Sequence, residues 1–269
     1  MLGAIIGDIV GSRFEFNNFR SKDFALFTEK NEATDDSIMT LAVADAIIKT
    51  DKRETKAEEF YVFLEKAVVS SMQDIGRMYP FCGFGGMFSQ WVFSSNPKPY
   101  NSFGNGAAMR ISPVGFIAKS EEEAIRMSKV VTVVTHNHKE GIKGAEATVV
   151  AIYMARQGCS KEQIRERINR EYYGLDFTMD EIRHSYQFNE TCQETVPQAI
   201  QAFLESTSFE DAIRTAISVG GDSDTLAAIT GGIAQAYYGI PKDIEKQALS
   251  YLDSKLRSIY DRWIEFQGQ

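Results

Sequence analysis

Cysteine and proline are scarce in this sequence. The three cysteines, Cys82, Cys159 and Cys192, are odd in number, far apart and without a CxxC pair. They therefore argue against a disulfide framework and a zinc knuckle, and we expect a reducing compartment, the cytoplasm. Only six prolines and no low-complexity tract are present, so no linker can be recognised. We expect one domain over residues 1–269.

Excess positive charge and long hydrophobic runs are also missing. The net charge of −8 argues against binding to a nucleic-acid backbone, although a bound metal could still attract a small anionic ligand. The apolar N-terminus, MLGAIIGDIVG, is interrupted by Asp8 and has no basic segment before it, so it is a poor signal peptide. No apolar stretch reaches the ~18 residues that a membrane-spanning helix needs. The 43% hydrophobic content is enough for a sizeable core.

Helical periodicity dominates what is there. Apolar residues recur at intervals of three and four, which predicts a helix wherever the pattern persists. The best strand candidate, VVTVV at 130–134, is flanked by helical pattern, and we interpret it as the end of a buried helix. The fold class is therefore all-α. The predicted helices cover 36–49, 57–72, 121–134, 138–156, 160–169, 195–205, 208–218, 224–238 and 242–265.

Two acidic clusters precede predicted helices, and either alone could be an ordinary helix cap. They are Thr34-Asp35-Asp36-Ser37 and Asp222-Ser223-Asp224-Thr225. Capping needs one oxygen-bearing side chain, and one acid in the first turn suits the helix dipole, whereas each cluster has four oxygen-bearing residues in a row. If the two clusters meet, four carboxylates repel one another and need a cation. Oxygen ligands without histidine or cysteine favour Mg²⁺ or Mn²⁺, and two clusters suggest two ions.

Glycines surround the second cluster on both sides. Gly220 and Gly221 precede it and allow a sharp bend. Gly231 and Gly232 lie inside the helix that follows, where each costs about 1 kcal/mol relative to alanine. Close packing of this helix on a neighbour explains them, and it could bring the second cluster beside the first.

Two further glycine-rich stretches, at 81–86 and 101–106, match neither a dinucleotide-binding GxGxxG nor a P-loop. The pattern His136-x-His138-x-Glu140 could suggest a metal site, but it lacks HExxH spacing and a third ligand. A histidine near a helix start with its hydrogen bonds satisfied is the favoured interpretation.

Taken together, these motifs resemble the ADP-ribosylglycohydrolase family, which includes enzymes that remove ADP-ribose from modified proteins and the dinitrogenase-reductase-activating glycohydrolase. They follow the family order and cover most of the chain. The resemblance implies a compact, orthogonal helical bundle with two metals in a cleft. The matching pieces are Gly7-Asp8, Gly11 to Glu15, Thr34 to Ser37, Gly83 to Gly86, Ser102 to Arg110, Thr135-His136 and Gly220 to Thr225, continuing to Tyr237-Tyr238-Gly239.

The resemblance also implies roles for particular residues. The metal ligands would be Thr34, Asp35, Asp36, Asp222, Asp224 and Thr225, while Ser37 departs from the threonine usual in the family. Glu15 would help to activate water, and Asp35 or Asp222 could assist the leaving group. Substrate contacts would come from Gly86, Ser102, Phe103, Gly104, Asn105, Gly106 and His136, with the diphosphate held by the backbone of residues 102–106.

The function implied is metal-dependent hydrolysis at ribose C1 of an ADP-ribosylated protein or a small molecule containing ADP-ribose. Glu15 favours O-linked substrates (serine-linked or poly-ADP-ribose) slightly over arginine-linked ones, although the loop at 16–33 is short and unlike that of either subgroup. Two alternatives stay open. One is a non-catalytic ADP-ribose-binding protein, and the other is a nucleotide pyrophosphate hydrolase.

Overall fold

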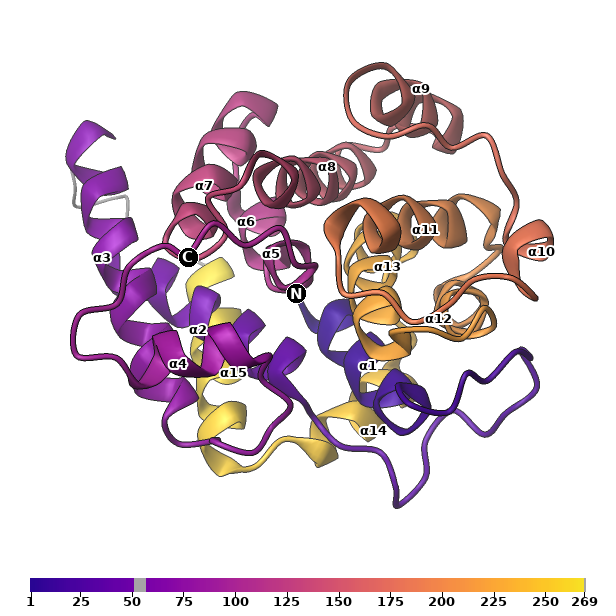
Figure 1. Ribbon diagram of the computed structural model, residues 1–269, viewed down its shortest axis with the longest axis horizontal. Coiled ribbons are helices and arrows are strands. Elements are labelled where there is room, and N and C mark those ends of the chain that lie inside the picture. The colour runs from indigo at the N-terminus through magenta and orange to yellow at the C-terminus, as the bar shows by residue number, and fades with distance from the viewer. Residues whose placement is uncertain (51–56, 269) are drawn as a thin grey trace.

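The computed structural model describes residues 1–50 and 57–268, and it is built of helices (Figure 1). Within these residues no strand forms, and Gly104 and Thr191 make an isolated antiparallel bridge. The predicted all-α class is thus confirmed. The helices of the first half are α1 (Leu2–Gly11), η1 (Ser12–Phe14), α2 (Asp35–Thr50), α3 (Ala57–Gly76), α4 (Gly86–Phe93), α5 (Gly106–Met109), α6 (Ser112–Ile117) and α7 (Glu121–Val133). Those of the second half are α8 (Lys139–Arg156), α9 (Lys161–Glu171), α10 (Met179–Ile182), α11 (Cys192–Glu205), α12 (Phe209–Ile217), α13 (Ser223–Tyr238), α14 (Lys242–Ala248), η2 (Leu249–Tyr251) and α15 (Ser254–Gln267).

Most of the predicted long helices form, and their starts follow ordinary capping chemistry. Ser120, Ser160 and Ser208 each accept a hydrogen bond from a backbone N–H in the first turn of the helix that follows. The segment 130–134 ends α7, as interpreted. The single helix predicted over 242–265 is wrong. The chain passes through a 3₁₀ turn there and restarts at Asp253, whose side chain accepts hydrogen bonds from the N–H groups of Lys255 and Leu256.

Helix α1 was not predicted, because it has no polar face to give it a period. All ten of its residues are buried, including Asp8. A helix surrounded by other helices is apolar on every side, and its sequence shows a run rather than a pattern. Along the described residues, no helix combines the length and the apolar character that crossing a membrane requires.

Helices α1 and α13 pack backbone to backbone, although they stand at opposite ends of the chain (Figure 1). A Cβ atom at Gly3 would lie 2.1 Å from the carbonyl oxygen of Gly231, and one at Gly7 would lie 2.0 Å from that of Ala227. A Cβ at Gly11 would lie 2.5 Å from Cα of Asp224. The glycines inside the predicted helix 224–238 therefore do serve close packing. Helix α13 approaches α1 most closely, and this packing brings Asp8 beside the second acidic cluster.

Helix α2 is covered by α3 and by the C-terminal α15. Its one acidic residue on the apolar stripe, Asp45, is buried but fully paired. Its carboxylate lies 2.6 Å from Nζ of Lys49 and 2.8 Å from Nη2 of Arg262, and it accepts a hydrogen bond of 2.7 Å from Oγ of Ser71. Asp45 thus joins α2 to α3 and α15, away from the acidic cluster at the start of α2.

Candidate active site

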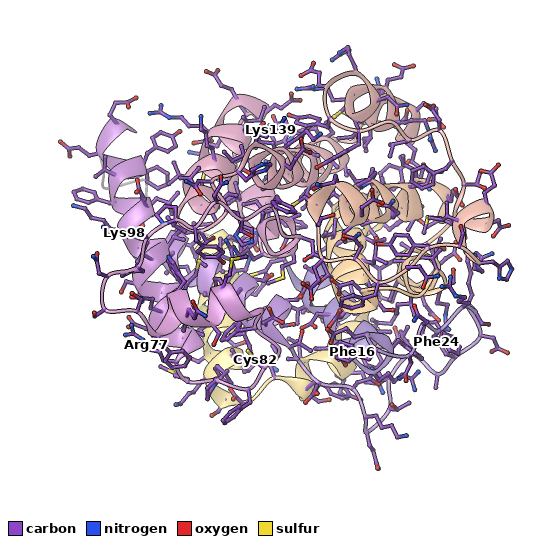
Figure 2. All side chains as sticks on the ribbon, in the orientation of Figure 1. Phe16, Phe24, Arg77, Cys82, Lys98 and Lys139 are labelled. Carbon is purple, nitrogen blue, oxygen red and sulfur yellow. The ribbon has the colours of Figure 1, made fainter. Side chains whose placement is uncertain are left out.

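A cleft of about 360 Å³ opens where α2 and α13 begin. The loop after α1, the turn before α4, the loop before α5 and the segment before α11 surround it. Figure 2 labels Phe16 and Cys82, which are chain neighbours of the lining residues Glu15 and Gly83. Every residue that the sequence nominated for substrate contact lines this cleft, as do all the nominated metal ligands except Thr34. The acidic lining residues are Glu15, Asp35, Asp36, Asp222, Asp224 and Glu190.

The two acidic clusters meet at the start of their helices. Oγ1 of Thr225 donates a 3.1 Å hydrogen bond to Oδ2 of Asp36, across 189 positions of the sequence. The other carboxylate oxygen of Asp36, Oδ1, is buried and has no hydrogen-bond partner. A buried, unpartnered carboxylate oxygen is costly in a protein unless a cation completes its environment.

The second cluster is shaped by the two glycines before it. Gly220 and Gly221 both have φ of +72°, a conformation that other residues rarely adopt, so the expected sharp bend is present. After the bend Asp222 stands at the N-cap position of α13 without a side-chain capping hydrogen bond, and its Oδ2 accepts a 2.6 Å hydrogen bond from the side-chain amide of Asn105. Asn105 thereby ties the glycine-rich loop at 101–106 to the acidic cluster.

Asp8 is a site residue that the sequence did not nominate. It accepts hydrogen bonds from the backbone N–H groups of Thr34 and Ser37, at 2.9 and 3.0 Å, and a short one from the Thr34 hydroxyl. These contacts fix the start of α2, and they leave the lone pairs of the Thr34 hydroxyl free for another partner. The sequence held two signals, a carboxylate inside an apolar run and the Gly7-Asp8 match to the family, and neither assigned Asp8 a role.

The carboxyl groups raise one another's pKa values, as expected of acids gathered in a buried place. Burial, followed by repulsion from Asp8 and Asp222, raises the pKa of Asp35 to about 8. Burial, followed by the charges of Asp222 and Asp8, raises the pKa of Glu15 to about 7. The pKa values of Asp36 and Asp224 also lie well above the usual range, mainly through burial. Such a set holds either protons or cations at neutral pH.

The donor atoms fit divalent cations. Two groups of carboxylates each bring three oxygens within 4.8 Å of one another. One joins Asp8, Asp36 and Asp224, and the other joins Glu15, Asp222 and Asp224. Because Asp8 already accepts three hydrogen bonds, it is better placed to anchor the site than to bind an ion. Carboxylate and hydroxyl oxygens without nitrogen or sulfur suit Mg²⁺ and Mn²⁺.

His136 lies under the glycine-rich loop, with its protonation fixed by its neighbours. The buried guanidinium of Arg110 approaches its Nδ1 at 3.2 Å, and the hydroxyl of Thr135 lies 2.7 Å from the same atom. Burial and then the charge of Arg110 hold the pKa of His136 well below its usual value. Since Nδ1 accepts from Arg110, the neutral ring carries its proton on Nε2. A Cβ at Gly106 would lie 3.4 Å from that atom, so glycine leaves it accessible.

Three backbone amides of the glycine-rich loop already have partners, and Asn101 donates to Oδ1 of Asn137 at 2.7 Å. Gly104 donates to Oγ of Ser102 at 3.1 Å, and Asn105 donates to the carbonyl oxygen of Glu190 at 2.7 Å. A phosphate at this loop would therefore rely also on side-chain donors, of which Nε2 of His136 is one. No role was predicted for Arg110 or Glu190 from the sequence, although Arg110 ends the matching segment Ser102 to Arg110.

The alternative metal site at residues 136–140 does not form. His138 accepts a hydrogen bond from the N–H of Glu140 as the cap of α8, and Glu140 pairs with Lys143 at 2.8 Å. Both side chains are thus explained by helix capping and a local ion pair.

An all-helical fold with carboxylates gathered around one cleft is the arrangement that the resemblance to the ADP-ribosylglycohydrolases implied. The family model for ADP-ribosylglycohydrolase matches residues 1–267, and the chain belongs to this family. It is 28% identical over 293 residues to the ADP-ribosylarginine hydrolase Tri1 of Pseudomonas putida (strain GB-1), covering 97% of this chain and 77% of Tri1. It is 25% identical over 341 residues to the ADP-ribosylhydrolase ARH3 of Xenopus tropicalis, covering 98% and 95%.

A solved structure shares the fold. It is described as an ADP-ribosylglycohydrolase-related protein complex, with a TM-score of 0.64 at 20% identity, and it covers 96% of this chain and 94% of that one. The all-helical arrangement is thus that of known members of the fold.

Proposed function

We propose that this glycohydrolase uses two divalent cations, Mg²⁺ or Mn²⁺, to cleave the bond at ribose C1 of ADP-ribosylated substrates and release ADP-ribose. The observation that carries the proposal is the meeting of both acidic clusters, Glu15 and the glycine-rich loop in one cleft. Thr34, Asp35 and Asp36 would hold the cations from one side, and Asp222, Asp224 and Thr225 from the other. When bound, such ions supply positive charge and lower the pKa of a coordinated water.

Glu15 is the proposed base. Its carboxylate belongs to a group with those of Asp222 and Asp224, and its pKa of about 7 suits proton transfer at neutral pH. It stands directly after η1 and lines the cleft. Water held between Glu15 and the acidic clusters would lie beside the ribose.

The leaving group needs a proton, and two carboxyl groups could supply it. Asp222 accepts the amide of Asn105, a hydrogen bond that favours its ionised form. In the metal-free protein, burial and the charges of Asp8 and Asp222 raise the pKa of Asp35, and burial raises that of Asp222. Either carboxyl group could therefore assist the departing atom, and the other would face the positive charge that develops on the ribose ring during glycoside cleavage.

The remaining parts of ADP-ribose would lie along the loop at 101–106. Ser102, Gly104, Gly106 and His136 would meet the diphosphate, and Phe103, with 44% of its surface exposed, would offer an aromatic face. Gly86, which also lines the cleft, would contact the substrate too. The partner is an ADP-ribosylated protein or a small molecule containing ADP-ribose. As its linkage we propose an O-linked one, serine-linked or poly-ADP-ribose, slightly ahead of arginine-linked, because Glu15 is present. ARH3 and Tri1, an arginine-directed enzyme by its name, are similarly distant relatives.

One experiment tests both the activity and the linkage. The protein is incubated with Mg²⁺ or Mn²⁺ and, in parallel, with serine-linked, arginine-linked and poly-ADP-ribose substrates, and the products are identified. Free ADP-ribose supports the proposal, and the faster substrate gives the linkage. Release of AMP would instead indicate pyrophosphate hydrolysis, and tight binding without turnover would indicate an ADP-ribose-binding protein. Full activity in the presence of a chelator would overturn the role of the metals.

A further inference from the structure

We propose that Arg20 is a positioning residue, which holds the loop carrying Glu15 in place against the second acidic cluster. The inference rests on the proposed function, because it assigns Arg20 an effect through Glu15. Arg20 lies outside the cleft, and no part of it lines the substrate site. Its guanidinium instead joins three segments of the chain that each supply a residue to the cleft.

The contacts of Arg20 are all with backbone carbonyl groups. Its Nη1 donates to the carbonyl oxygen of Val219 at 2.9 Å and to that of Arg183, and its Nη2 donates to that of Tyr186 at 2.5 Å. Val219 stands three positions before Asp222, and Tyr186 stands two before Phe188, which lines the cleft. One half-buried side chain thus satisfies carbonyls from two loops at once, a geometry that suits the planar fork of arginine.

The partners of Arg20 are firmly held. Val219 is fully buried, and Tyr186 is nearly so, with its hydroxyl donating to the carbonyl oxygen of Glu194 at 2.6 Å. The ring of Tyr186 also packs against Gly221, where a Cβ would come within 2.5 Å of it. The carbonyl groups that receive Arg20 are therefore a fixed support.

The loop that Arg20 restrains is far less buried. Phe16, Asn17 and Asn18 are exposed, and Asn18 has a φ of +45°. Besides the guanidinium of Arg20, a hydrogen bond and a ring pair join this loop to the support. Oδ1 of Asn18 accepts from the N–H of Gly221 at 3.1 Å, and the ring of Phe16 stacks on that of Phe188 with centroids 5.9 Å apart. Without the guanidinium, the part-buried hydrogen bond of Asn18, the exposed ring pair and the stacking of Phe19 on Phe14 would remain to hold the loop that follows Glu15.

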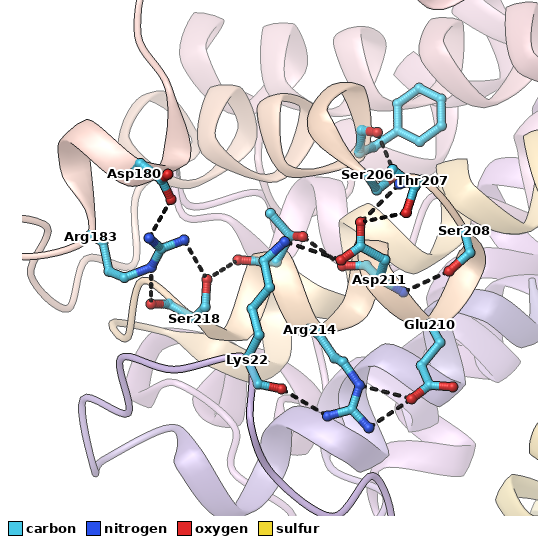
Figure 3. Close-up of polar contacts among 12 residues, drawn as sticks. Lys22, Asp180, Arg183, Ser206, Thr207, Ser208, Glu210, Asp211, Arg214 and Ser218 are labelled. Atoms are coloured by element: carbon cyan, nitrogen blue, oxygen red, sulfur yellow. Dashed lines mark hydrogen bonds and ion pairs between the residues drawn. The ribbon is translucent and has the colours of Figure 1, made fainter.

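Neighbouring arginines secure the same region from outside (Figure 3). Arg214 donates to the carbonyl oxygen of Lys22 at 2.9 Å, and Arg183 donates to both oxygens of Ser218 at 3.2 Å. Lys22 reaches the surface helix α12, where its Nζ lies 3.1 Å from Oδ1 of Asp211. Lys22 is thus a matched control. It is a cation of the same loop, it cross-links through its side chain, and it touches no carbonyl beside the cleft.

The test is a double-mutant cycle between Arg20 and Glu15, with kcat and KM measured for the substrate that the enzyme cleaves fastest. Glu15→Gln should lower kcat by about 100-fold, as expected for loss of a general base. Arg20→Ala should lower kcat by about tenfold and change KM little, and Arg20→Lys should recover part of the loss. In the Glu15→Gln background, Arg20→Ala should lower kcat by less than about twofold, because the group it positions is already gone. Lys22→Ala should match wild type.

Hydrogen exchange checks the loop without any need for turnover. The amides of residues 15–19 should exchange faster in Arg20→Ala than in wild type or Lys22→Ala, while those of α13 stay protected. Unchanged exchange in Arg20→Ala would overturn the inference even if the protein hydrolyses nothing. Fully additive losses in the cycle would also overturn it, since they would mean that Arg20 acts independently of Glu15. If Glu15→Gln retains full kcat, both the base assignment and this inference are wrong, whereas the hydrolase assignment stands.

Discussion

Two buried aspartates on α2 show how environment decides what a carboxylate does. Asp45 has Lys49, Ser71 and Arg262 around it, and nothing about it calls for a ligand. Asp36, less than three turns away, shares its surroundings with Asp8, Asp35 and Asp222, and one of its oxygens has no partner. The same residue type on the same helix is thus structural in one place and a proposed metal ligand in the other.

This contrast gives a prediction for single residues. Asp36→Ala and Asp224→Ala should each abolish hydrolysis and remove the rise in Tm that Mg²⁺ or Mn²⁺ causes. Without metal, the Tm of each variant should lie close to that of metal-free wild type, because each variant loses a buried carboxyl group whose charge repels its neighbours. Activity assays and thermal melts with and without chelator measure both effects.

Asp45→Asn provides the control for those variants. It should lower the free energy of unfolding by about 1–3 kcal/mol, since charged hydrogen bonds are lost, but leave the metal-induced rise in Tm intact. If Asp36→Ala behaves like Asp45→Asn in this comparison, the first cluster is a helix cap and not a metal site.

At the scale of helices, the sequence was most informative where one face of a helix is exposed to solvent. Segments such as 121–134 and 160–169 alternate between core and solvent, and capping serines mark their starts, so their patterns predict their structures. Helix α1 is buried on all sides and has no such pattern. The break at 249–253 was hidden because apolar spacing continues through it. Backbone turns of this kind depend on contacts that periodicity does not record.

The residues of the site likewise divide into those that the sequence predicts and those that it does not. Two runs of four oxygen-bearing residues in sequence could be recognised, and so could the glycines that shape their surroundings. The roles of Asp8, Arg20 and Arg110 could not be recognised, because each acts through partners more than twenty positions away. A single residue whose partners are distant in the sequence produces no recognisable spacing pattern. The pairing of α1 with α13, which brings these groups together, is a property of the fold.

The close packing of α1 on α13 gives a prediction at the scale of helices. Gly7→Ala would place a Cβ 2.0 Å from the carbonyl oxygen of Ala227, so α1 and α13 must move apart. We expect the free energy of unfolding to fall by about 1–3 kcal/mol, as for other overpacked cores. Asp8 would move with α1, so activity should fall even at temperatures where the variant is folded. Denaturant unfolding and kcat/KM at low temperature measure the two effects.

The matched control is Gly174→Ala. Gly174 is exposed, and an added Cβ there would lie 3.7 Å from the nearest atom, Oδ2 of Asp176. It should change stability by less than about 0.5 kcal/mol. A Gly7→Ala protein that unfolds and reacts like Gly174→Ala would show that the two helices do not approach as closely as described.

For the whole molecule, the acidic site is a junction between the two ends of the chain. Helices α1 and α2 reach it from the N-terminal side, and α13 reaches it from nearly two hundred residues later. Cations at this junction would link the halves of the bundle, so their binding free energy would add to the stability of the fold. Without them, the halves are held together against the mutual repulsion of their carboxylates.

This repulsion should make the metal-free protein less stable as pH rises. In the metal-free protein, mainly burial raises the pKa values of Asp8, Glu15 and Asp35 to about 6, 7 and 8. Groups with raised folded-state pKa values stabilise the fold fully below their unfolded values, near 4, and lose that contribution as pH rises through the folded values. Metal-free Tm should therefore fall from pH 6 to pH 8.

Cations bind the deprotonated forms, so the rise in Tm caused by Mg²⁺ should be larger at pH 8 than at pH 6. Thermal melts in chelator and in Mg²⁺ at both pH values measure this. Asp36→Ala should show little of the metal effect at either pH, and an equal rise at both pH values in the wild type would mean that the cations do not displace protons from these carboxyl groups.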